Sequence, residues 1–580
     1  MQSGTNLAET NLEKLRTWMA TNNVEAIHVP REDMFGGEYV TASDERLAWV
    51  SGFTGSAGLA IITIDEAHLF VDGRYTLQAK AQASDFEIHA LSHSEIIKVW
   101  DSLKPATLHY DPWLMPVKQL KNWNESINLK PLKENSIDIL WTDRPTPDSK
   151  PAYDYPMEYA GKSREEKLEY IRDPLTEKEA IFLSNAESVC WLLNIRGADL
   201  PHVPLLHCMA LITKEDITLF CDPQKITQDL AKKLNIKVVP FERMLSTIQS
   251  LRTTIVADST TTPSALLKKG NHLQFQRNII FNWQPDPCEL PKAKKNVTEQ
   301  EGMRQCHIRD AAAVIRFWKW LEAQKNITEV EAQDQLGVFR SQIDLYQGDS
   351  FATISGFGPH GAIVHYRATP ESNIPLGKGL YLLDSGGQYL DGTTDITRTF
   401  AIGTPTQQQK EHYTLVLKGH IALSNITFPV GTTGAQLDAL ARQYLWNQGL
   451  DYSHGTGHGV GSFLNVHEGP QGISKARGTV LEPGMVVSNE PGLYLEGEYG
   501  IRIENLQIVT KSTCNGFLCF EPLTLVPYEP LLTDTSLLIN SEITWLKGYC
   551  QAILDKISPT LNKPEQDWLK DKINNISESL

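Results

Sequence analysis

The sequence predicts two related α/β domains followed by a third domain with a different pattern. The chain has 580 residues, 41% of them apolar, so it is too long for one hydrophobic core and we expect three or four domains. The segment "GLAIITIDEAHLFVD" at 58–72 aligns with "CMALITKEDITLFCD" at 208–222. Each predicts a strand, a charged turn and a second strand, and each is followed by a helix-like run and then another strand and turn. A spacing of about 150 residues indicates an internal repeat.

A Pro-rich linker separates the two repeats. It reads "DRPTPDSKPAYDYP" over residues 143–156. We therefore expect a first α/β domain over 1–150, a second over 151–298 and a third over 299–580. The third domain holds every cluster of catalytic-type residues.

Three Thr-x-x-Glu sequences predict helix starts: "TNLE" at Thr10, "TEKE" at Thr176 and "TEQE" at Thr298. In this capping box, the Thr hydroxyl accepts a hydrogen bond from a backbone N–H, and the Glu carboxylate accepts one from the N–H of the Thr. We expect an amphipathic helix after each of them.

Composition excludes several classes of function. The net charge of −16 is a poor match for nucleic acid, because phosphate binding depends on clustered Lys and Arg. No apolar run reaches the roughly 18 to 20 residues that a membrane-spanning helix needs. The start, "MQSGTNLAETNLEKL", lacks a basic stretch followed by an apolar one. We expect a cytoplasmic protein that binds neither nucleic acid nor membrane.

The eight cysteines are scattered and contain no Cys-x-x-Cys pair. In a reducing cytosol this pattern favours buried free thiols over disulfides or a zinc site.

Four carboxylates stand at strand-like positions in the third domain. Asp384 and Asp395 lie in "LLDSGGQYLDGTTDITRTF" at 382–400, and Glu490 and Glu504 lie in "MVVSNEPGLYLEGEYGIRIENLQIV" at 485–509. Each segment reads as β-rich runs joined by a Gly-containing turn. The sequence therefore predicts two hairpins that bring two carboxylates each.

Three histidines lie between these hairpins, in "SHGTGHGVGSFLNVHEGP" at 453–470: His454, His458 and His467. The glycines around the first two allow the backbone and the imidazoles to approach a ligand closely. A phosphate loop is the alternative interpretation of "HGTGHGVG", but no Gly-Lys-Ser/Thr follows it.

A single carboxylate at a strand end is usually a turn cap or solvated, and we interpret Asp391 in this way. Four carboxylates in one domain interior would raise one another's pKa values unless cations held them apart. A pair of divalent cations is the economical solution. An oxygen-rich ligand set with one imidazole and no thiolate suits Mn²⁺, Co²⁺ or Fe²⁺ better than a structural zinc ion.

At these residues the sequence resembles the metal-dependent aminopeptidase P family (Xaa-Pro aminopeptidases), in particular its long, three-domain cytosolic form. The flanking motifs are "DGTTDITRT", "HGTGHGVG", "VHEGP", "NEPGLY" and "GIRIEN". The resemblance extends to "GFTGSAG" and "VDGRYTLQA" in the first domain, "WLLNIRGAD" in the second and "FEPLTLVPYEPLL" near the end. It implies two creatinase-type N-terminal α/β domains and a C-terminal pita-bread metallopeptidase domain, an α+β fold with a C-terminal extension.

The resemblance also implies a role for each site residue. Asp384 would bind one metal ion, His458 and Glu490 would bind the other, and Asp395 and Glu504 would bind both. Glu490 would in addition move protons during catalysis. The other catalytic or peptide-binding residues would be His365, His454, His467, Tyr494 and Arg502. His365 is matched in "AIVHYR", with His360 as its rival.

The implied activity is hydrolysis of the bond between an N-terminal residue and a following proline, by a hydroxide that bridges two divalent metal ions. Mn²⁺ is the expected metal, with Co²⁺, Fe²⁺ or Zn²⁺ as alternatives. Peptides with proline at the second position are the expected partners, and the resemblance implies a homodimer through the C-terminal domain.

Three other functions are weighed against this one: a peptide-binding pseudoenzyme of the same fold, a metal-free creatinase-like amidinohydrolase and a methionine aminopeptidase. The complete ligand set argues against the first two. The two N-terminal domains and the long C-terminal tail argue against the third.

Overall fold

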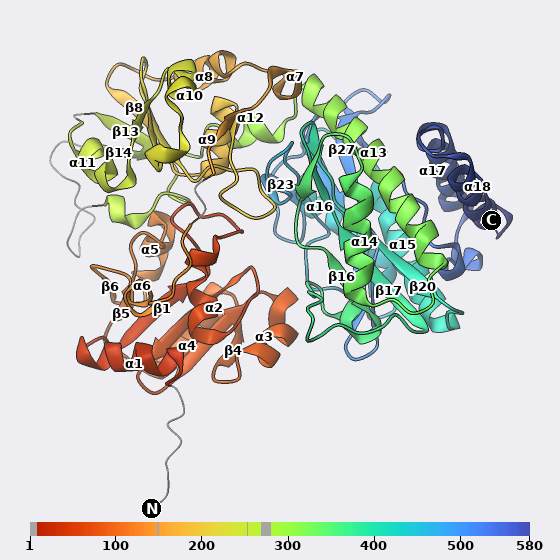
Figure 1. The fold of residues 1–580 in the computed structure, drawn as a ribbon, viewed down its shortest axis with the longest axis horizontal. Helices are drawn as coiled ribbons and strands as arrows, with labels where there is room; N and C mark the ends of the chain where they lie inside the picture. The colour runs from red at the N-terminus through yellow and green to blue at the C-terminus, as the bar shows by residue number, and fades with distance from the viewer. Residues whose placement is uncertain (1–8, 148–149, 252, 268–279, 580) are drawn as a thin grey trace, which may run out of the picture. The chain divides into compact units, whose positions relative to one another are not determined.

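The computed structural model describes residues 9–147, 150–251, 253–267 and 280–579 (Figure 1). The chain divides into two compact units. The first comprises Met1–Asp154, Arg164–Pro201 and Leu205–Cys288, and the second comprises Tyr155–Ser163, His202–Pro204 and Glu289–Leu580.

The first unit begins with a six-stranded mixed sheet in the order β4-β3-β2-β1-β5-β6. Its strands are β1 Ala26–Pro30, β2 Gly58–Thr63, β3 Ala67–Val71, β4 Glu87–Ala90, β5 Leu108–Tyr110 and β6 Leu129–Pro131. The strands β1, β2 and β3 are antiparallel, while β4 joins β3, β5 joins β1 and β6 joins β5 in parallel.

Helices cover both faces of this sheet. They are α1 Asn11–Thr21, α2 Arg46–Ser51, α3 Thr76–Gln82, α4 His93–Leu103, α5 Val117–Trp123 and α6 Ser136–Leu140. Alternate residues of β2 point to opposite faces, as a strand requires. Ala60 and Ile62 pack in a core with α1 and α2, whereas Leu59 and Ile61 pack in a core with α4 and α5.

A second six-stranded sheet repeats the first, in the order β12-β11-β10-β8-β13-β14. Its strands are β8 Glu179–Leu183, β10 Met209–Ile212, β11 Ile217–Phe220, β12 Lys237–Val239, β13 Thr254–Ala257 and β14 Ile280–Trp283. The parallel and antiparallel pairs fall at the same places as in the first sheet. The two aligned sequences form the equivalent hairpins β2–β3 and β10–β11, so the predicted repeat is confirmed.

The helices of this second half are α8 Arg164–Arg172, α9 Ala186–Leu193, α10 Gln228–Leu234 and α11 Met244–Gln249. The helix α10 follows β11 as α3 follows β3, which matches the predicted helix-like runs. The short strands β7 Tyr153–Asp154 and β9 Ile195–Arg196 precede and follow β8 along the chain, and they form a separate antiparallel pair.

The second unit combines long helices with antiparallel strands. The helices are α7 Met157–Ala160, α12 Glu289–Ala293, α13 Val297–Glu322, α14 Glu329–Ser341, α15 Gln407–Ser424, α16 Gly434–Trp446, α17 Asn540–Lys556 and α18 Lys563–Ser579. The helices α13, α14 and α15 lie together along the strands β16, β17 and β20 in Figure 1. Side chains from α13, α15, α17, β17 and β20 form the main core.

The strands of the second unit form four sheets. Their orders are β15-β18-β19, β16-β17-β20, β21-β28-β27-β24-β22-β23 and β25-β26. The strands are β15 Tyr346–Asp349, β16 Ile354–Phe357, β17 Gly379–Ser385, β18 Gly387–Tyr389, β19 Gly392–Thr393, β20 Ile396–Ile402, β21 Thr427–Pro429, β22 Gly457–Gly459, β23 Glu468–Ile473, β24 Val486–Asn489, β25 Gly492–Leu495, β26 Tyr499–Arg502, β27 Asn505–Lys511 and β28 Phe517–Pro522.

The three predicted helix starts have different outcomes. Thr10 caps α1 with the full capping box, so this prediction is confirmed. A helix also starts near Thr298, but Asn296 is its cap and pairs with Glu299, because Asn serves as a cap at least as well as Thr.

The prediction of a helix at Thr176 is wrong. The carboxylate of Glu179 does accept hydrogen bonds from the backbone and hydroxyl of Thr176, at 3.1 and 2.8 Å, but these close a turn before β8. The apolar residues that follow pair with β10 and β13, and this pairing overrides the local helix signal.

Asp391 lies in the turn between β18 and β19, as expected, but it is not solvated. Its two oxygens lie 2.5 and 2.7 Å from Arg309, and it is buried. All eight cysteines lie within the described ranges and are free thiols, as predicted, but only six of them are buried: Cys514 is exposed and Cys519 is half-buried. In the part of the chain that the structure describes, no helix combines the length and apolar character of a membrane span.

Candidate metal centre

Two antiparallel strand pairs carry the four predicted carboxylates. In the pair β17–β20, Asp384 lies opposite Thr397, and Asp395 directly precedes β20. In the pair β24–β27, Asn489 lies opposite Asn505, so Glu490 and Glu504 flank the same end of the pair. Each strand pair therefore brings two carboxylates to one end, as the sequence predicted, but the short strand pairs β18–β19 and β25–β26 connect the strands where simple turns were expected.

Thr397 joins the two strand pairs. Its hydroxyl donates to Glu504 Oε2 at 2.7 Å, and its backbone carbonyl accepts from the N–H of Glu504 at 3.1 Å. Because Thr397 is the β20 residue opposite Asp384, these bonds fix Glu504 beside the first pair of carboxylates.

His458 lies among these carboxylates. Ligand atoms of Asp395, His458 and Glu504 all lie within 4.8 Å of one another. His458 Nε2 is 3.4 Å from Asp395 Oδ2 and 3.5 Å from Glu490 Oε1. Its Nδ1 donates to the carbonyl of Gly459 at 2.9 Å, so a neutral ring presents the Nε2 lone pair to the carboxylates. A lone pair and two carboxylates at this distance favour a cation between them.

Burial and mutual repulsion act on these acids. Burial raises the pKa of Asp395 well above its usual value, and the charges of Asp384 and Glu490 add to it. Burial and the charge of Asp395 likewise raise the pKa of Glu504, and burial raises that of Glu490. The group therefore carries more negative charge than its protein surroundings stabilise.

Two carboxylate oxygens of this group also lack hydrogen-bond donors. Among the described residues, Oδ1 of Asp384 and Oδ1 of Asp395 are buried and have no hydrogen-bond partner. Buried oxygen atoms normally have partners. Divalent cations would supply both the missing partners and the missing positive charge, so the donor set fits a metal centre. Four carboxylates, one imidazole and no thiolate suit Mn²⁺, Co²⁺ or Fe²⁺.

A chain of hydrogen bonds leads from Asp384 to His454. Arg502 donates to Asp384 Oδ2 at 2.6 Å and to the Tyr494 hydroxyl at 2.6 Å. The Tyr494 hydroxyl lies 2.8 Å from His454 Nε2. His454 Nδ1 donates to the carbonyl of Gly455 at 2.7 Å, so Tyr494 is the donor to Nε2. Burial raises the pKa of Tyr494, which keeps this hydroxyl protonated.

His467 contacts the metal-site histidine directly. Its ring meets that of His458 edge to face, with ring centroids 4.3 Å apart. Its backbone N–H is held by the side chain of Asn465 at 3.2 Å.

His365 and its rival His360 lie in different surroundings. His360 Nδ1 is 2.9 and 3.0 Å from the two oxygens of Glu329, and its ring stacks on Tyr366. His365 is half-buried, and the carbonyl of the preceding Val364 accepts from Arg502 at 3.4 Å. The contact with Arg502 brings the segment of His365 next to the hydrogen-bond chain of Asp384.

Two supporting groups were missed from the sequence. Glu329, fully buried at the start of α14, accepts hydrogen bonds from Phe357 N, His360 and the Tyr366 hydroxyl at 2.7–3.0 Å. No local signal distinguishes it from an ordinary acidic residue at a helix start.

The second missed group is the buried pair Asp438 and Arg442 on α16. Arg442 donates to Asp438 and to the carbonyl of His454, both at 2.7 Å, and Asp438 accepts from Thr456 at 2.6 Å. This pair thereby holds the loop of His454. An acid and an arginine four residues apart usually form an exposed helix pair, so no local signal distinguishes this buried pair.

Sequence profiles of known families match nearly the whole chain. The profile of metallopeptidase family M24 matches residues 301–511, and that of the C-terminal region of peptidase M24 matches 516–576. Two profiles of the creatinase/prolidase N-terminal domain match residues 11–139 and 143–299.

Known proteins are similar to the chain over nearly its full length. The probable Xaa-Pro aminopeptidase P of Laccaria bicolor is 40% identical, over 96% of this chain and 92% of that protein. Aminopeptidase P1 of Lotus japonicus is 37% identical, over 97% and 99% respectively. A solved structure, the X-prolyl aminopeptidase of Caenorhabditis elegans, is 34% identical with a TM-score of 0.91 and covers 97% of this chain and 98% of that one. That protein is described as a cytosolic enzyme with a di-nuclear active site.

Proposed function

Because the chain belongs to metallopeptidase family M24, with Xaa-Pro aminopeptidases as its full-length relatives, we propose that it is an Xaa-Pro aminopeptidase. It hydrolyses the bond between the N-terminal residue of a peptide and a following proline. The observation that carries the proposal is the group of Asp395, His458 and Glu504, with Asp384 and Glu490 on the same strand ends. A peptide-binding pseudoenzyme has no comparable observation in its favour.

The proposed metal ligands are the five residues selected from the sequence. Asp384 holds one cation, His458 and Glu490 hold the other, and Asp395 and Glu504 contribute to both. The unpartnered oxygens of Asp384 and Asp395 and the lone pair of His458 Nε2 support this assignment. The metal is proposed to be Mn²⁺, with Co²⁺, Fe²⁺ or Zn²⁺ as alternatives.

When bound, two divalent cations would polarise the scissile carbonyl and would lower the pKa of a water molecule to near neutrality. Glu490 accepts a proton from the attacking water and delivers it to the leaving proline nitrogen. The imidazole of His467 donates a hydrogen bond to the oxygen on which negative charge develops. His365 and His454 position the peptide, and Asp384 faces the free α-amine of the substrate, which limits the enzyme to one residue.

Specificity for proline follows from the amide that is cleaved. The nitrogen before a proline ring carries no hydrogen, and the ring fixes φ near about −65°. A site for this bond needs a shaped pocket rather than an acceptor for an N–H group. We propose that His454, His467, Tyr494 and Arg502 line this pocket. The chain Arg502–Tyr494–His454 supports the proposal, because its hydrogen bonds hold three of these side chains in place.

We also propose the division into domains at 1–150, 151–298 and 299–580, a cytosolic location and a homodimer through the C-terminal domain. The family profiles for the creatinase/prolidase N-terminal domain support the first of these, and the cytosolic relative supports the second.

The proposal is tested with tripeptides and purified full-length protein. Release of arginine from Arg-Pro-Pro should require added Mn²⁺ and should stop after treatment with a chelator. Arg-Ala-Pro and N-acetylated Arg-Pro-Pro should be inert. Equal rates on Arg-Ala-Pro and Arg-Pro-Pro would leave a general metalloaminopeptidase and remove the proline specificity.

A further inference from the structure

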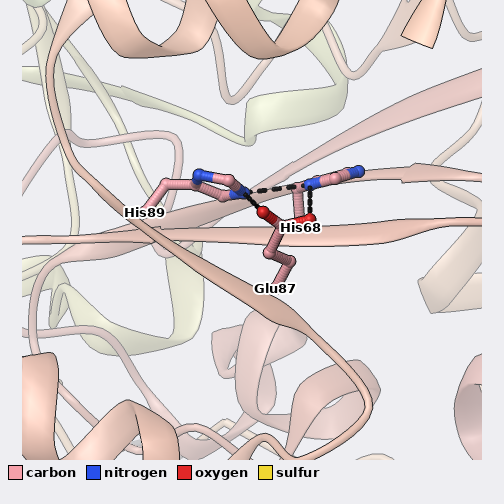
Figure 2. A group of neighbouring side chains, drawn as sticks. All are labelled: His68, Glu87 and His89. Carbon is pink, nitrogen blue, oxygen red and sulfur yellow. Dashed lines mark hydrogen bonds and ion pairs between the residues drawn. The ribbon is translucent and has the colours of Figure 1, made fainter. Parts of the chain in front are cut away.

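A second group of metal-ligand side chains lies in the first unit, away in sequence from the site described above. His68 on β3 and Glu87 and His89 on β4 bring ligand atoms within 4.8 Å of one another (Figure 2). The strands β3 and β4 are parallel, with His68 opposite Glu87 and Phe70 opposite His89. The three side chains therefore project from the same face of the sheet.

The distances between the donor atoms match the ligand spacing of a single ion. His68 Nδ1 and His89 Nε2 are 3.0 Å apart. Glu87 Oε2 lies 3.6 Å from His68 Nδ1, and the other oxygen, Glu87 Oε1, lies 3.7 Å from His89 Nε2. Ligands about 2.0–2.1 Å from a tetrahedral Zn²⁺ lie roughly 3.3 Å from one another. The two ring nitrogens and the nearest oxygen of Glu87 to each of them thus lie close to the spacing that zinc ligands need.

The outer nitrogens of both rings face further carboxylates. His68 Nε2 lies 3.5 Å from Glu66 Oε2, and His89 Nδ1 lies 3.7 Å from Glu95 Oε1 in the first turn of α4. Histidines that bind a metal commonly direct their other N–H to a carboxylate, which orients the ring and raises its basicity. Both outer nitrogens lie at ion-pair distance from a carboxylate, and His68 Nε2 has no hydrogen-bond partner among the described residues.

A pair of neutral, metal-free histidines fits this arrangement poorly. In the contact between His68 and His89, one ring must donate and the other must accept. If His68 Nδ1 donates, its Nε2 lone pair faces Glu66. If His89 Nε2 donates, its Nδ1 lone pair faces Glu95. Either tautomer sets a lone pair against a carboxylate.

A cation between the two rings removes this conflict. Both inner nitrogens then bind the cation, and both outer N–H groups point to carboxylates. An extra proton on His89 satisfies the same set, so a proton is the competitor of the metal. His68 is 4% exposed, so a cation bound by its inner nitrogen would be shielded from solvent on that side.

We propose that His68, Glu87 and His89 bind one divalent cation of the zinc class and that this ion fastens the strand β4 to β3. Two imidazoles and a carboxylate are a ligand set that zinc accepts. The strand β4 has four residues and lies at the edge of its sheet, where it has a partner on one side only. A bound ion gives this strand a link that its own hydrogen bonds and packing do not provide.

Metal analysis of the full-length protein tests the proposal. Chelator-treated protein is equilibrated with Zn²⁺ at pH 7.5, passed over gel filtration and analysed for zinc per chain by mass spectrometry. His89→Gln and Glu87→Gln should each lose one zinc per chain and keep peptidase activity. Their affinity for this ion should fall by at least about 100-fold, since loss of even an outer-shell partner costs up to about that much. His93→Gln, an exposed histidine on α4, is the matched control and should lose none.

A second background separates this site from the proposed catalytic centre. In Asp395→Asn/Glu504→Gln protein, one zinc per chain should remain, and adding His89→Gln should remove it. Zinc should also raise the midpoint of thermal unfolding in the parent and in His93→Gln, but not in His89→Gln. Glu87 is exposed, so Glu87→Gln tests the site without threatening the fold. Equal zinc content in the parent and in His89→Gln, or a protonated His89 in the presence of zinc at pH 7.5, would overturn the proposal.

Discussion

Asp395 and Glu504 are the carboxylates whose loss should harm the proposed centre most, because each would hold both cations. Asp395→Asn or Glu504→Gln replaces an anionic bridge with a neutral amide of the same shape. We expect turnover to be abolished and the fold to be kept, with fewer than two metal ions in this centre. Activity on Arg-Pro-Pro, metal content and circular dichroism measure the three effects. Glu496→Gln, an exposed residue in the β25–β26 turn, is the control and should retain full activity.

His467 tests the separation between metal ligands and other catalytic groups. His467→Ala should lower the catalytic rate by roughly 100-fold or more, the range for loss of one donor to a developing oxyanion, while metal content stays unchanged. His458→Ala is the matched comparison, because the two rings touch but only His458 is a proposed ligand. Loss of metal from the His467 variant would show that the two roles have been assigned wrongly.

The buried histidine His28 should make the stability of the fold depend on pH. It lies in β1, meets Trp123 edge to face, and has no hydrogen-bond partner for either nitrogen among the described residues. Burial lowers its pKa from 6.5 to about 3. Below about pH 6.5 this imidazole therefore binds a proton in the unfolded chain but not in the folded chain. Its effect on the free energy of unfolding is absent above that pH, and the protein becomes less stable as the pH falls below it.

The expected loss is about 1.4 kcal/mol for each pH unit below about 6.5, until the folded pKa is reached. His28→Leu removes this group and should flatten the fall in unfolding midpoint between pH 7 and pH 5. His93→Leu, at an exposed position, should leave the slope as it is. Parallel pH profiles for His28→Leu and the parent would contradict the prediction.

At the scale of elements, Glu329 connects the start of α14 with the segment that carries His365. One buried carboxylate holds the end of β16, the ring of His360 and the hydroxyl of Tyr366. These contacts give the segment a fixed path between β16 and β17, with Val364 beside Arg502.

Glu329→Gln should therefore loosen this segment. An amide keeps the shape but cannot accept all of these hydrogen bonds, and a buried group left unsatisfied costs about 1–3 kcal/mol. We expect a lower unfolding midpoint together with a fall in kcat/KM of up to about 100-fold, because small displacements of positioning groups have effects of that size. Glu331→Gln in the exposed capping box of the same helix should change stability only slightly. An unchanged kcat/KM in the Glu329 variant would exclude its role in positioning.

The difference between Glu329 and the four proposed ligand carboxylates shows what the sequence can predict. Asp384, Asp395, Glu490 and Glu504 stand in apolar, β-rich runs, where a carboxylate is out of place and needs a partner. Glu329 and the pair Asp438 and Arg442 stand in helices, where charged residues are ordinary, and only tertiary packing buries them.

Pairing between distant strands sets a similar limit. The aligned hairpins at 58–72 and 208–222 were visible because each forms from adjacent residues. Thr176 carried a valid local signal that pairing of β8 with β10 and β13 overrode. His68 and His89 come together only through the parallel pairing of β3 with β4, so their grouping could not be predicted from local sequence.

At the scale of the whole molecule, the second unit includes residues that precede its long helix α13. Lys292 and Lys295 are buried and both pair with Glu468, the residue next to His467. Tyr155 donates to the carbonyl of Leu390 at 2.7 Å, and Asn296 donates to the carbonyl of Ala160 at 2.8 Å. A fragment that starts at residue 299 keeps all five proposed ligands but loses these contacts.

We therefore expect residues 299–580 alone to be poorly active or to aggregate. Without Lys292 and Lys295, the carboxylate of Glu468 loses both of its counter-charges, and removing one partner of a buried ion pair costs about 3–5 kcal/mol. A fragment that starts at 289 keeps both lysines, so its unfolding midpoint should be about 10 °C higher than that of 299–580, at about 2–4 °C for each kcal/mol.

The variant Glu468→Gln isolates the charge from the other effects of truncation. In the full-length protein it should lower stability, because two buried lysines lose their counter-charge. In 299–580 it should raise stability, because it removes the unpaired carboxylate. Thermal unfolding of the full-length protein and of 299–580, each with and without the substitution, measures both signs. If Glu468→Gln changed the unfolding midpoint in the same direction in both proteins, loss of the two lysines would not be what destabilises the fragment. Full activity of 299–580 would show that neither the lysines nor the preceding residues support the site.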